Sequence, residues 1–447
     1  MNPAATPTAS VSRRLADFVH GVSCAGLPPP VVDRAKTRIL DCIATAIAAR
    51  ALPVPSVALR SIAGGSGPCT LIGQSATAGA ADAAFVNATL VNGCSQDDFL
   101  EKSHPGALTV PGALAIGEIH GRTGAEVIAA VVAGYDVIGR VYLGGPEMLP
   151  RFRASGVAGS VGAAATAGKL LGLDADALVH ALGCGAMFSC GFGQGFLSGT
   201  MDVKLNVGMS SRNGVAAALL AQAGATASEL AFEGPSGFYN AFSGGTGKVE
   251  PALRDLGRRF LIDDTVYKER PLCIFVQTPV ALAVDLAARE RIDPARIEKV
   301  TLTAPELTYT NPGFTNVAPF RTHLQAVVSS RFCVAAALLG RPVGEYAFYD
   351  SNREDAEVLA LAARVELRRG EPEAGDRIEL EVLQGGRTLA IRGMENETLK
   401  PAKDKIVAKF HRLAGGFLGS RTDPVLDMVM SLETLANVRM LTSELKA

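Results

Sequence analysis

The sequence predicts a mainly α protein, with a large all-helical domain and a small α+β domain that contains an antiparallel sheet. Apolar residues recur at helical spacing through the N-terminal half, alternating segments appear only later, and a helical pattern returns near the end of the chain. We therefore expect the large helical domain at residues 1–265 together with residues 405–447, and the small α+β domain at residues 266–404. A cleft between two such domains is a common place for a small-molecule site.

Helical periodicity runs through the N-terminal half of the chain. The segment PPPVVDRAKTRILDCIATAIAAR, residues 28–50, places apolar residues three and four apart after a proline start. The pattern returns at residues 124–144, 159–187 and 210–224. Many positions in these helices carry Ala, Gly or Ser, which lets helix axes approach closely. We therefore expect a compact multi-helix domain.

Strand patterns appear only in the C-terminal half. The alternating segments are ARIEKVTLTA, ARVELRRG and DRIELEVLQGGRTLAIRG. The last of them predicts two strands around a Gly385-Gly386 turn. Helical stretches lie between the strands, at about residues 277–291 and 324–340. This order predicts an α+β domain with a mostly antiparallel sheet.

Composition excludes several classes of function. The formal charge is −1, which lacks the basic excess of a nucleic-acid-binding protein. No apolar run reaches the ~18–20 residues that a membrane span needs, so we expect no membrane association. The eight cysteines form no CxxC pair, which favours free thiols in a reducing compartment. The first residues lack an apolar core of signal-peptide length, so we expect a frayed polar lead into the first helix and a cytoplasmic protein.

No motif indicates a cofactor or a metal. The GFGQG at residues 191–195 follows no predicted strand and lacks the spacing of a dinucleotide-binding loop. No two of the six histidines stand at metal-ligand spacing, and no GxSxG nucleophile elbow is present. We therefore expect neither a cofactor nor a bound metal.

One loop concentrates ionisable residues beside a fixed turn. In SQDDFLEKSHPG, Asp97 and Asp98 precede His104, which opens a His-Pro-Gly turn. A histidine near carboxylates exchanges protons near neutral pH, so His104 is a candidate acid or base. The alternative is a solvated loop whose acids cap the following helix. His323, beside Arg321 and just before a helical stretch, is a further candidate for the site.

Five segments in order resemble a known family, the MmgE/PrpD family. They are ADAAFVNATLVNGCSQDDF…HPGALTVPGALAIGE, GVAGSVGAAATAGKLLGL, GTMDVKLNVGMSSRNGVAAALLAQAG, FEGPSGFYNAF and SSRFCVAAALLG. The resemblance runs from about residue 30 to residue 415. It implies the two-domain architecture, a homodimer, and metal-free chemistry on small di- or tricarboxylates. The reactions of that family share proton removal, or formation of a carbanion or enolate, next to a carboxylate.

The resemblance also implies positions for the site. Set against the family's motif around residues 87–105, a family histidine falls on Asn92, an aspartate on Ser95 and a threonine on Phe99. The family's aspartate pair and the histidine of its His-Pro turn are retained, as Asp97, Asp98 and His104.

Further along the chain the family's polar residues are partly replaced. Its next histidine is Arg153, which binds a carboxylate with two hydrogen bonds but is no base at neutral pH. Two residues on, the family's threonine is Ser155. The lysine of the GTM-x-K segment falls on Val203, and Lys204 follows it. In KERPLCIFVQ, Lys268 is retained, a family cysteine falls on Cys273, and the final histidine is Gln277, which cannot shuttle a proton.

Together these residues predict a cofactor-independent lyase or isomerase that acts on a small polycarboxylate. We expect Arg153 and Lys204 to hold carboxylates, with Ser155, Gln277, Asn92, Ser95 and His323 as further substrate-binding residues. Lys268 or His104 would move the proton, Asp97 or Asp98 would orient His104, and Tyr142 would join them. Lys268 could be the base only if its pKa were lowered by several units.

Two alternatives stay open. The enzyme could act on a larger biosynthetic intermediate, since Phe99 and the aromatic-rich MFSCGFGQGF suggest a more apolar pocket, although core packing also explains these phenylalanines. The replaced histidines also fit a non-catalytic protein that kept the fold and only binds.

Overall fold

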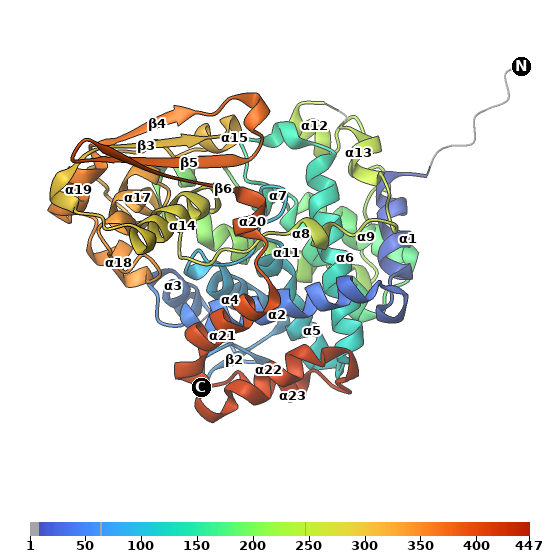
Figure 1. Cartoon of the computed structure of the whole chain (residues 1–447). Helices are drawn as coiled ribbons and strands as arrows, with labels where there is room; N and C mark the ends of the chain where they lie inside the picture. The colour runs from blue at the N-terminus through green and yellow to red at the C-terminus, as the bar shows by residue number, and fades with distance from the viewer. Residues whose placement is uncertain (1–8, 63–64, 246) are drawn as a thin grey trace, which may run out of the picture.

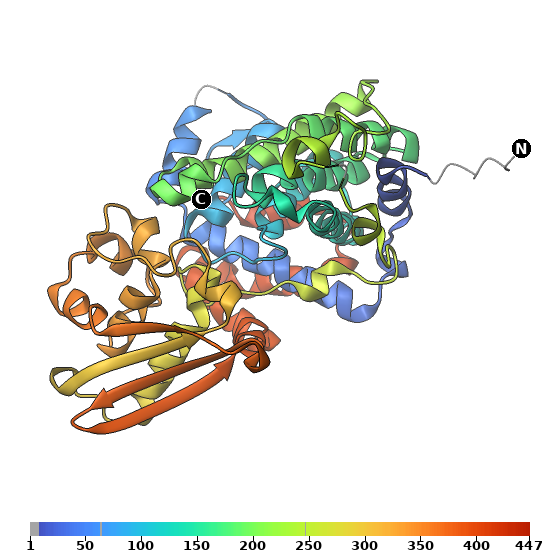
Figure 2. The ribbon, with the colours of Figure 1, turned by 90° about the horizontal axis from the view of Figure 1, so that it is seen from above.

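The computed structural model describes residues 9–62, 65–245 and 247–447 (Figure 1). Residues 1–8, with which the predicted polar lead begins, lie outside these described residues. The predicted fold class is confirmed, because helices dominate and one small sheet lies in the C-terminal half. Figure 2 shows the sheet and its helices beside the larger helical body.

The larger body is built from helices of both chain ends. From the N-terminal part come α1 (Val11–Gly21), α2 (Pro29–Ala48), α3 (Pro53–Ser61), α4 (Ala80–Gly93), α5 (Pro105–His120), α6 (Gly124–Leu143), α7 (Ala154–Val157), α8 (Gly159–Leu171), α9 (Ala175–Met187), α10 (Gln194–Ser198), α11 (Asp202–Gln222), α12 (Phe238–Ser243) and α13 (Val249–Leu253). From the C-terminal part come α21 (Lys403–Leu418), α22 (Thr422–Met430) and α23 (Arg439–Glu444). Helices α21 and α22 pack on α2, and α23 packs on α5.

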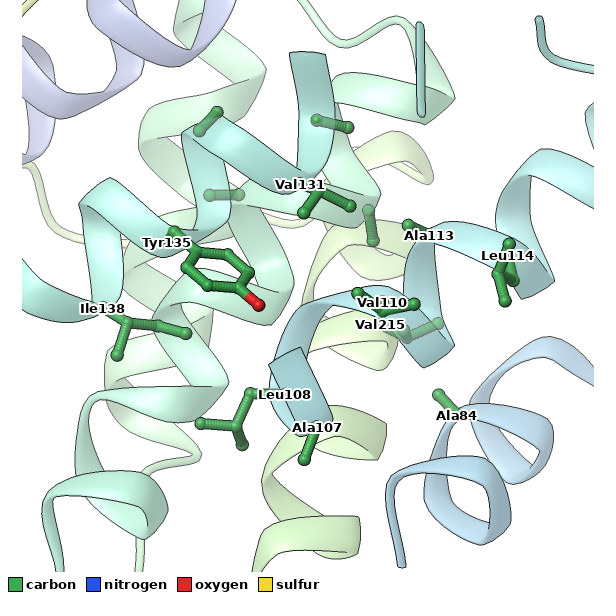
Figure 3. Close-up of a cluster of buried hydrophobic side chains, with 14 of the residues drawn as sticks. Ala84, Ala107, Leu108, Val110, Ala113, Leu114, Val131, Tyr135, Ile138 and Val215 are labelled. Atoms are coloured by element: carbon green, nitrogen blue, oxygen red, sulfur yellow. The ribbon is translucent and has the colours of Figure 1, made fainter. Parts of the chain in front are cut away.

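Two separate apolar cores hold the structure together. One joins residues 11–262 with residues 410–445, and the other spans residues 272–389. Figure 3 shows part of the first core, where side chains of α4, α5, α6 and α11 meet. The domain boundaries drawn from the sequence stay a prediction, although the two cores separate close to them.

Small residues bring helices close together, as the sequence predicts. Gly134 of α6 faces α8 at such short range that a Cβ atom there would lie 2.0 Å from the Thr166 hydroxyl oxygen. Gly162 of α8 faces α6 in turn, with a built Cβ atom 2.2 Å from Ile138. Neither helix can carry a side chain at this crossing.

Replacing Gly134 with alanine is therefore expected to lower the free energy of unfolding by about 1–3 kcal/mol, because overpacking a close crossing forces atoms apart. The matched control is Gly416→Ala on α21, where a Cβ atom meets nothing within 4 Å. That change should raise the free energy of unfolding by about 0.5–1 kcal/mol, since glycine is a poor helix former. Urea unfolding curves measure both, and a neutral Gly134→Ala would contradict the close crossing.

The smaller body is a four-stranded sheet with helices on it. Its elements are α14 (Ile274–Arg289), β3 (Ile297–Ala304), α15 (Glu306–Tyr309), α16 (His323–Val327), α17 (Ser330–Leu338), α18 (Tyr346–Ser351), α19 (Ala356–Ala362), β4 (Val365–Arg369), β5 (Arg377–Gln384), β6 (Arg387–Met394) and α20 (Glu395–Leu399). The strand order is β4-β3-β5-β6. The predicted hairpin is confirmed, with Gly385 and Gly386 both at positive φ in the β5–β6 turn.

The predicted mostly antiparallel sheet is confirmed, since β3 pairs antiparallel with β5 and β5 with β6, while β4 runs parallel to β3. The structure differs from the sequence predictions at two places. The predicted helix at residues 324–340 is two helices, since the Ser329 side chain accepts a hydrogen bond from Phe332 N and starts α17. A short hairpin, β1 (Cys69–Thr70) with β2 (Thr77–Ala78), interrupts the region predicted as wholly helical.

Short 3-10 helices complete the described chain. They are η1 (Cys24–Gly26), η2 (Pro146–Met148), η3 (Leu261–Asp264), η4 (Pro294–Arg296), η5 (Pro372–Ala374), η6 (Gly419–Arg421) and η7 (Leu432–Thr434). Within the residues that the structure describes, no single helix is long and apolar enough to cross a membrane. Helices α2 and α3 pass that test of length and composition only as a pair bent by 89°.

Candidate active site

A cavity of about 390 Å³ opens between the two bodies. The larger body lines it with residues from three segments, 92–104, 149–154 and 193–204. The smaller body contributes residues from 268–275 and 307–328. This is the position at which the sequence predicts a site.

The loop between α4 and α5 carries the central polar residues. Three of its residues, Ser95, Glu101 and Lys102, have positive φ angles of 59°, 46° and 61°, a conformation that costs non-glycine residues energy. Asp98 anchors the loop, because its carboxylate accepts hydrogen bonds from Gly106 N at 3.0 Å and from the Tyr135 hydroxyl at 2.6 Å. Because Gly106 lies in the first turn of α5, the contacts of Asp98 fit the alternative given above, in which an acid of this loop caps the following helix.

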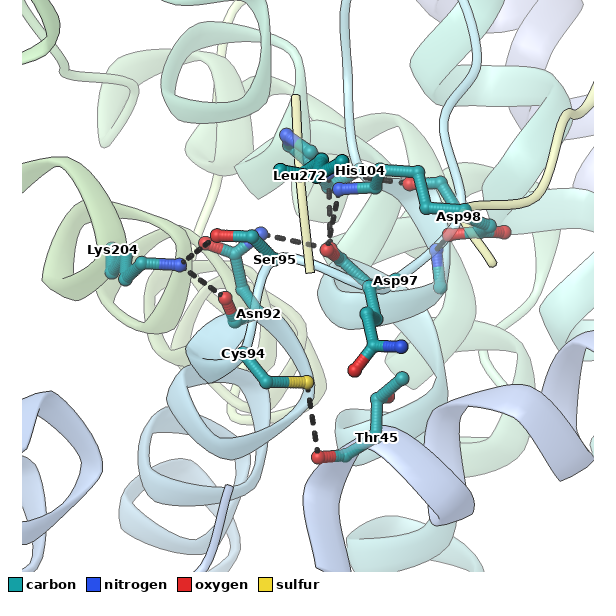
Figure 4. A network of polar contacts seen from close by, with 12 residues as sticks. Thr45, Asn92, Cys94, Ser95, Asp97, Asp98, His104, Lys204 and Leu272 are labelled. Atoms are coloured by element: carbon teal, nitrogen blue, oxygen red, sulfur yellow. Dashed lines mark hydrogen bonds and ion pairs between the residues drawn. The ribbon is translucent and has the colours of Figure 1, made fainter. Parts of the chain in front are cut away.

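Asp97 is the centre of a buried polar network (Figure 4). Its carboxylate lies 3.0 Å from Lys268 Nζ and 3.0 Å from His104 Nδ1, and it accepts a hydrogen bond of 2.8 Å from Asn92 Nδ2. Burial alone would raise the pKa of Asp97, but His104, Lys268 and the Asn92 amide outweigh it and hold this pKa well below 3.8. Asp97 is therefore ionised at neutral pH.

These contacts fix the tautomer of His104. Its Nδ1 faces two acceptors, the Asp97 carboxylate and the Asp98 carbonyl oxygen at 3.2 Å, so Nδ1 carries the hydrogen. Burial lowers the pKa of His104 below 6.5, and Lys268 and Arg153 lower it further against the opposing effect of Asp97. The ring is thus neutral at pH 7, with a lone pair on Nε2. Because His104 lines the cavity, Nε2 is the nitrogen available to a bound molecule.

The charged side chains that line the cavity are all basic. They are Lys102, Arg153, Lys204 and Lys268, and no Asp or Glu lies among the described lining residues. Lys204 Nζ donates to the Asn92 carbonyl oxygen and to Ser95 Oγ, both at 2.7 Å. Burial lowers the pKa of Lys204 to about 8 and that of Arg153 to about 10, so both are cations at pH 7. Such a cavity favours an anionic ligand.

A second ion pair supports this network from behind. Lys409 of α21 lies 2.7 Å from the Asp41 carboxylate, and both side chains are buried. Lys409 Nζ also donates to the carbonyl oxygens of Gln96, at 2.7 Å, and of Lys268, at 2.8 Å. One ammonium thus holds the loop that carries Asp97 against the segment that carries Lys268.

Seven of the predicted residues come together in this way. They are Asn92, Ser95, Asp97, His104, Arg153, Lys204 and Lys268. The family's lysine position falls on Val203, but it is the next residue, Lys204, that brings an ammonium to the cavity. The Val203 carbonyl oxygen accepts a hydrogen bond from Arg153 Nη1. Cys273 also lines the cavity, where burial raises the pKa of its thiol.

Gln277 and Ser155 lie outside the described cavity lining, engaged elsewhere. The Gln277 amide bonds the backbone of Arg270 and Leu272, so its polar atoms are occupied by the turn before α14. Ser155 is buried and accepts a hydrogen bond from the Ser103 hydroxyl.

Asp98, Tyr142 and His323 are likewise absent from the described lining. Tyr142 packs in the first core, where burial raises its pKa to about 12. His323 stacks on Tyr346 with ring centroids 4.0 Å apart, and burial lowers its pKa to about 3. These three residues do not line the described cavity, and their catalytic or binding roles stay predictions.

Two supporting cations were not predicted from the sequence. Lys102 stands two residues before His104 in the same loop, so its proximity was a usable signal. Lys409 falls on the apolar stripe of α21 with Ile406 and Phe410, and a charge on such a stripe indicates a buried partner. Among the described residues, no group of three or more His, Cys, Asp or Glu side chains is arranged to hold a metal ion.

Known proteins match the chain over nearly its whole length. The family models for the MmgE/PrpD N-terminal domain and the MmgE/PrpD C-terminal domain match residues 13–250 and 271–434. A cis-aconitate decarboxylase of Aspergillus terreus is 24% identical, over 96% of this chain and 94% of its own. The cis-aconitate decarboxylases of Homo sapiens (24% identical, 80% and 76%) and Mus musculus (25% identical, 98% and 93%) are also similar. With both family models matched in order, the chain belongs to the MmgE/PrpD family.

Proposed function

We propose that this protein is a lyase or isomerase that forms a carbanion or enolate next to a carboxylate of a small polycarboxylic acid. Family membership and the similar decarboxylases support a lyase of the dehydratase or decarboxylase type that acts on small acids. The observation that carries the proposal is the Asp97–His104 pair, set in a cavity whose charged side chains are all basic.

In the proposed reaction, His104 exchanges a proton at Nε2. Asp97 keeps the Nδ1–H tautomer and stabilises the imidazolium that forms when Nε2 accepts a proton from the substrate carbon. Lys204 and Arg153 hold the substrate carboxylates, so the negative charge that develops meets fixed cations. The proton on Nε2 then returns to carbon in an isomerisation, or follows the leaving group in an elimination.

The sequence left open that Lys268 moves the proton, and the scheme proposed here gives Lys268 another role. Its ammonium donates to the Asp97 carboxylate at 3.0 Å, which helps to keep Asp97 ionised. We therefore propose that Lys268 helps to hold the substrate anion and the ionised Asp97, and that His104 is the base.

The pH dependence of kcat/KM is expected to be bell-shaped. Activity should rise with pH as His104 loses its proton, with this limb below pH 6.5 because the pKa of His104 is lowered. It should fall above about pH 8 as Lys204 loses its charge, since its pKa is about 8. Lys204→Met should abolish the alkaline limb and raise KM about tenfold to hundredfold, the worth of a charged hydrogen bond. An unchanged alkaline limb in Lys204→Met would assign that limb to another group.

Hydrogen exchange in D₂O, followed by NMR, tests the proposed chemistry. We expect the protein to catalyse exchange or elimination at a carbon next to a carboxylate in at least one acid of a di- and tricarboxylate panel. The reaction should be lost in Lys268→Ala, which removes the cation paired with Asp97. A panel that stays silent with folded wild-type protein, alkyl-substituted acids included, would refute the proposal and favour the second candidate, a protein that binds carboxylates without turning them over.

Homodimer formation and a cytoplasmic location, both expected from the sequence, stay proposals. Light scattering after size-exclusion chromatography tests the first. A mass of twice 46.3 kDa is the expected result, and a monomer at micromolar concentration would contradict it.

A further inference from the structure

We propose that the substrate is amphiphilic: a polycarboxylic acid that carries an apolar chain, with the chain lying along the cavity wall and reaching its mouth. This inference rests on the proposed function, because it names the substrate class of the same site. It follows from how polar and apolar side chains are distributed with depth in the cavity.

Most of the polar groups lie at the buried end, while Lys102 and Arg153 are partly exposed. Asn92, Lys204 and Lys268 are buried, and the side chain of His104 is only 15% exposed. Through Asp97 these groups form one connected network. The carboxylates of a ligand are therefore bound at the inner end of the cavity.

The mouth has the opposite character. Five lining residues are exposed, and none of them is charged: Pro150, Leu197, Leu307, Thr310 and Pro312. Leu197 of α10 is 62% exposed and Leu307 of α15 is 64% exposed, so the two bodies each place a leucine at the opening. These five exposed residues offer no charge to a ligand, and the Thr310 hydroxyl already donates to a backbone oxygen of α15. A ligand that was charged at every end would therefore gain little at the mouth.

An aromatic wall connects the two ends. The Phe99 ring stands edge-on to His104, with centroids 5.5 Å apart, and 6.3 Å from Phe275. Lys102 Nζ lies 4.4 Å from the centre of the Phe275 ring, which shields that cation within the wall. An apolar group attached next to the reacting carbon would thus lie against Phe99 while the carboxylates stay on the cations.

Binding of a homologous series tests this directly. Succinate and its 2-methyl, 2-butyl and 2-hexyl derivatives share the two carboxylates and differ only in the chain. We expect calorimetric Kd values to fall about three- to fourfold for each methylene buried, as transfer of a CH₂ group from water predicts. Equal Kd values for succinate and 2-hexylsuccinate would overturn the inference.

Two rim variants locate the chain. Leu197→Asp and Leu307→Asp should remove the gain in affinity from 2-butylsuccinate to 2-hexylsuccinate, because the outer methylenes would reach the mouth, while leaving the Kd of succinate within about twofold, because both side chains are exposed at the opening. The control Met440→Asp, at an equally exposed position on α23, should leave the whole series unchanged. A gain in affinity from the 2-butyl to the 2-hexyl derivative that persists in both rim variants would overturn the proposed path to the mouth.

The two proposals fail in different ways. Exchange that occurs on unsubstituted acids, with no preference for alkylated ones, would refute the amphiphilic substrate and leave the proposed chemistry standing. Tight binding of 2-hexylsuccinate without exchange or elimination on any alkylated or unsubstituted acid would refute the chemistry and leave the ligand class standing.

Discussion

Replacing His104 with asparagine should lower kcat by about 10²–10⁴-fold, the usual contribution of a positioned acid or base, while KM changes little. The introduced amide would still reach Asp97 from the position of Nδ1, so the substitution removes Nε2 and little else. Steady-state kinetics on the substrate identified by exchange measures the effect. Far-UV circular dichroism should show the same fold.

The matched control for this variant lies at the other end of the same helix. His120 ends α5 and is exposed, so His120→Asn should retain wild-type kcat. Retention of more than a tenth of kcat in His104→Asn would place the base elsewhere. Lys268 would then be the next candidate for the base, because it lines the cavity and, like His104, contacts the Asp97 carboxylate.

Asp97→Asn should affect both catalysis and stability. Without the carboxylate, the His104 tautomer is no longer fixed, and a loss in kcat of about 10³–10⁴-fold is expected by analogy with other carboxylate–histidine pairs. Lys268 would also be left as a buried cation without its partner, which should lower the free energy of unfolding by about 3–5 kcal/mol. Urea unfolding and steady-state kinetics measure the two effects.

The stability difference has a defined pH dependence. Because the pKa of Asp97 is lower in the folded protein than its usual 3.8, its ionised form stabilises the folded state. This contribution is complete above the unfolded pKa and is lost as the pH falls through the folded one. The gap in stability between wild type and Asp97→Asn should therefore narrow as the pH falls below about 4.

Asp98→Asn is the control for Asp97→Asn. Burial raises the pKa of Asp98 to about 6, so the folded protein disfavours its ionised form and a neutral amide should cost at most about 1 kcal/mol. We expect its kcat to stay within about threefold of wild type. A loss as large as that of Asp97→Asn would give Asp98 the catalytic role that its contacts do not suggest.

Periodicity was enough to predict most of the fold. The strands β3 to β6 follow from their alternation and α2 from apolar residues at helical spacing, whereas α4 and α5 are buried on nearly all sides. The parallel pairing of β4 could not be predicted, since strand direction depends on how the intervening helices pack. The β1–β2 hairpin was missed because each strand is two residues long, which is too short to show alternation.

Loop geometry limits how far the site could be predicted. Asp97 and Asp98 are adjacent residues of the same type, yet the carboxylate of Asp97 bonds His104 and that of Asp98 accepts from Gly106 N at the start of α5. Gln277 is turned away by the backbone atoms of its own N-terminal turn, which no sequence motif reveals. Resemblance to the family places residues along the chain, whereas hydrogen bonding decides which of them face the cavity.

The Lys409 contacts have a consequence for how the protein is synthesised. Gln96 and Lys268 are made early, but the ammonium that holds their carbonyl oxygens together comes from residue 409. During translation, the N-terminal helices of the first core can therefore form before Lys409 is available to join the segments of Gln96 and Lys268 by hydrogen bonds. We expect ribosome-bound chains stalled before α21 to be inactive, so a working site forms only once α21 has been made.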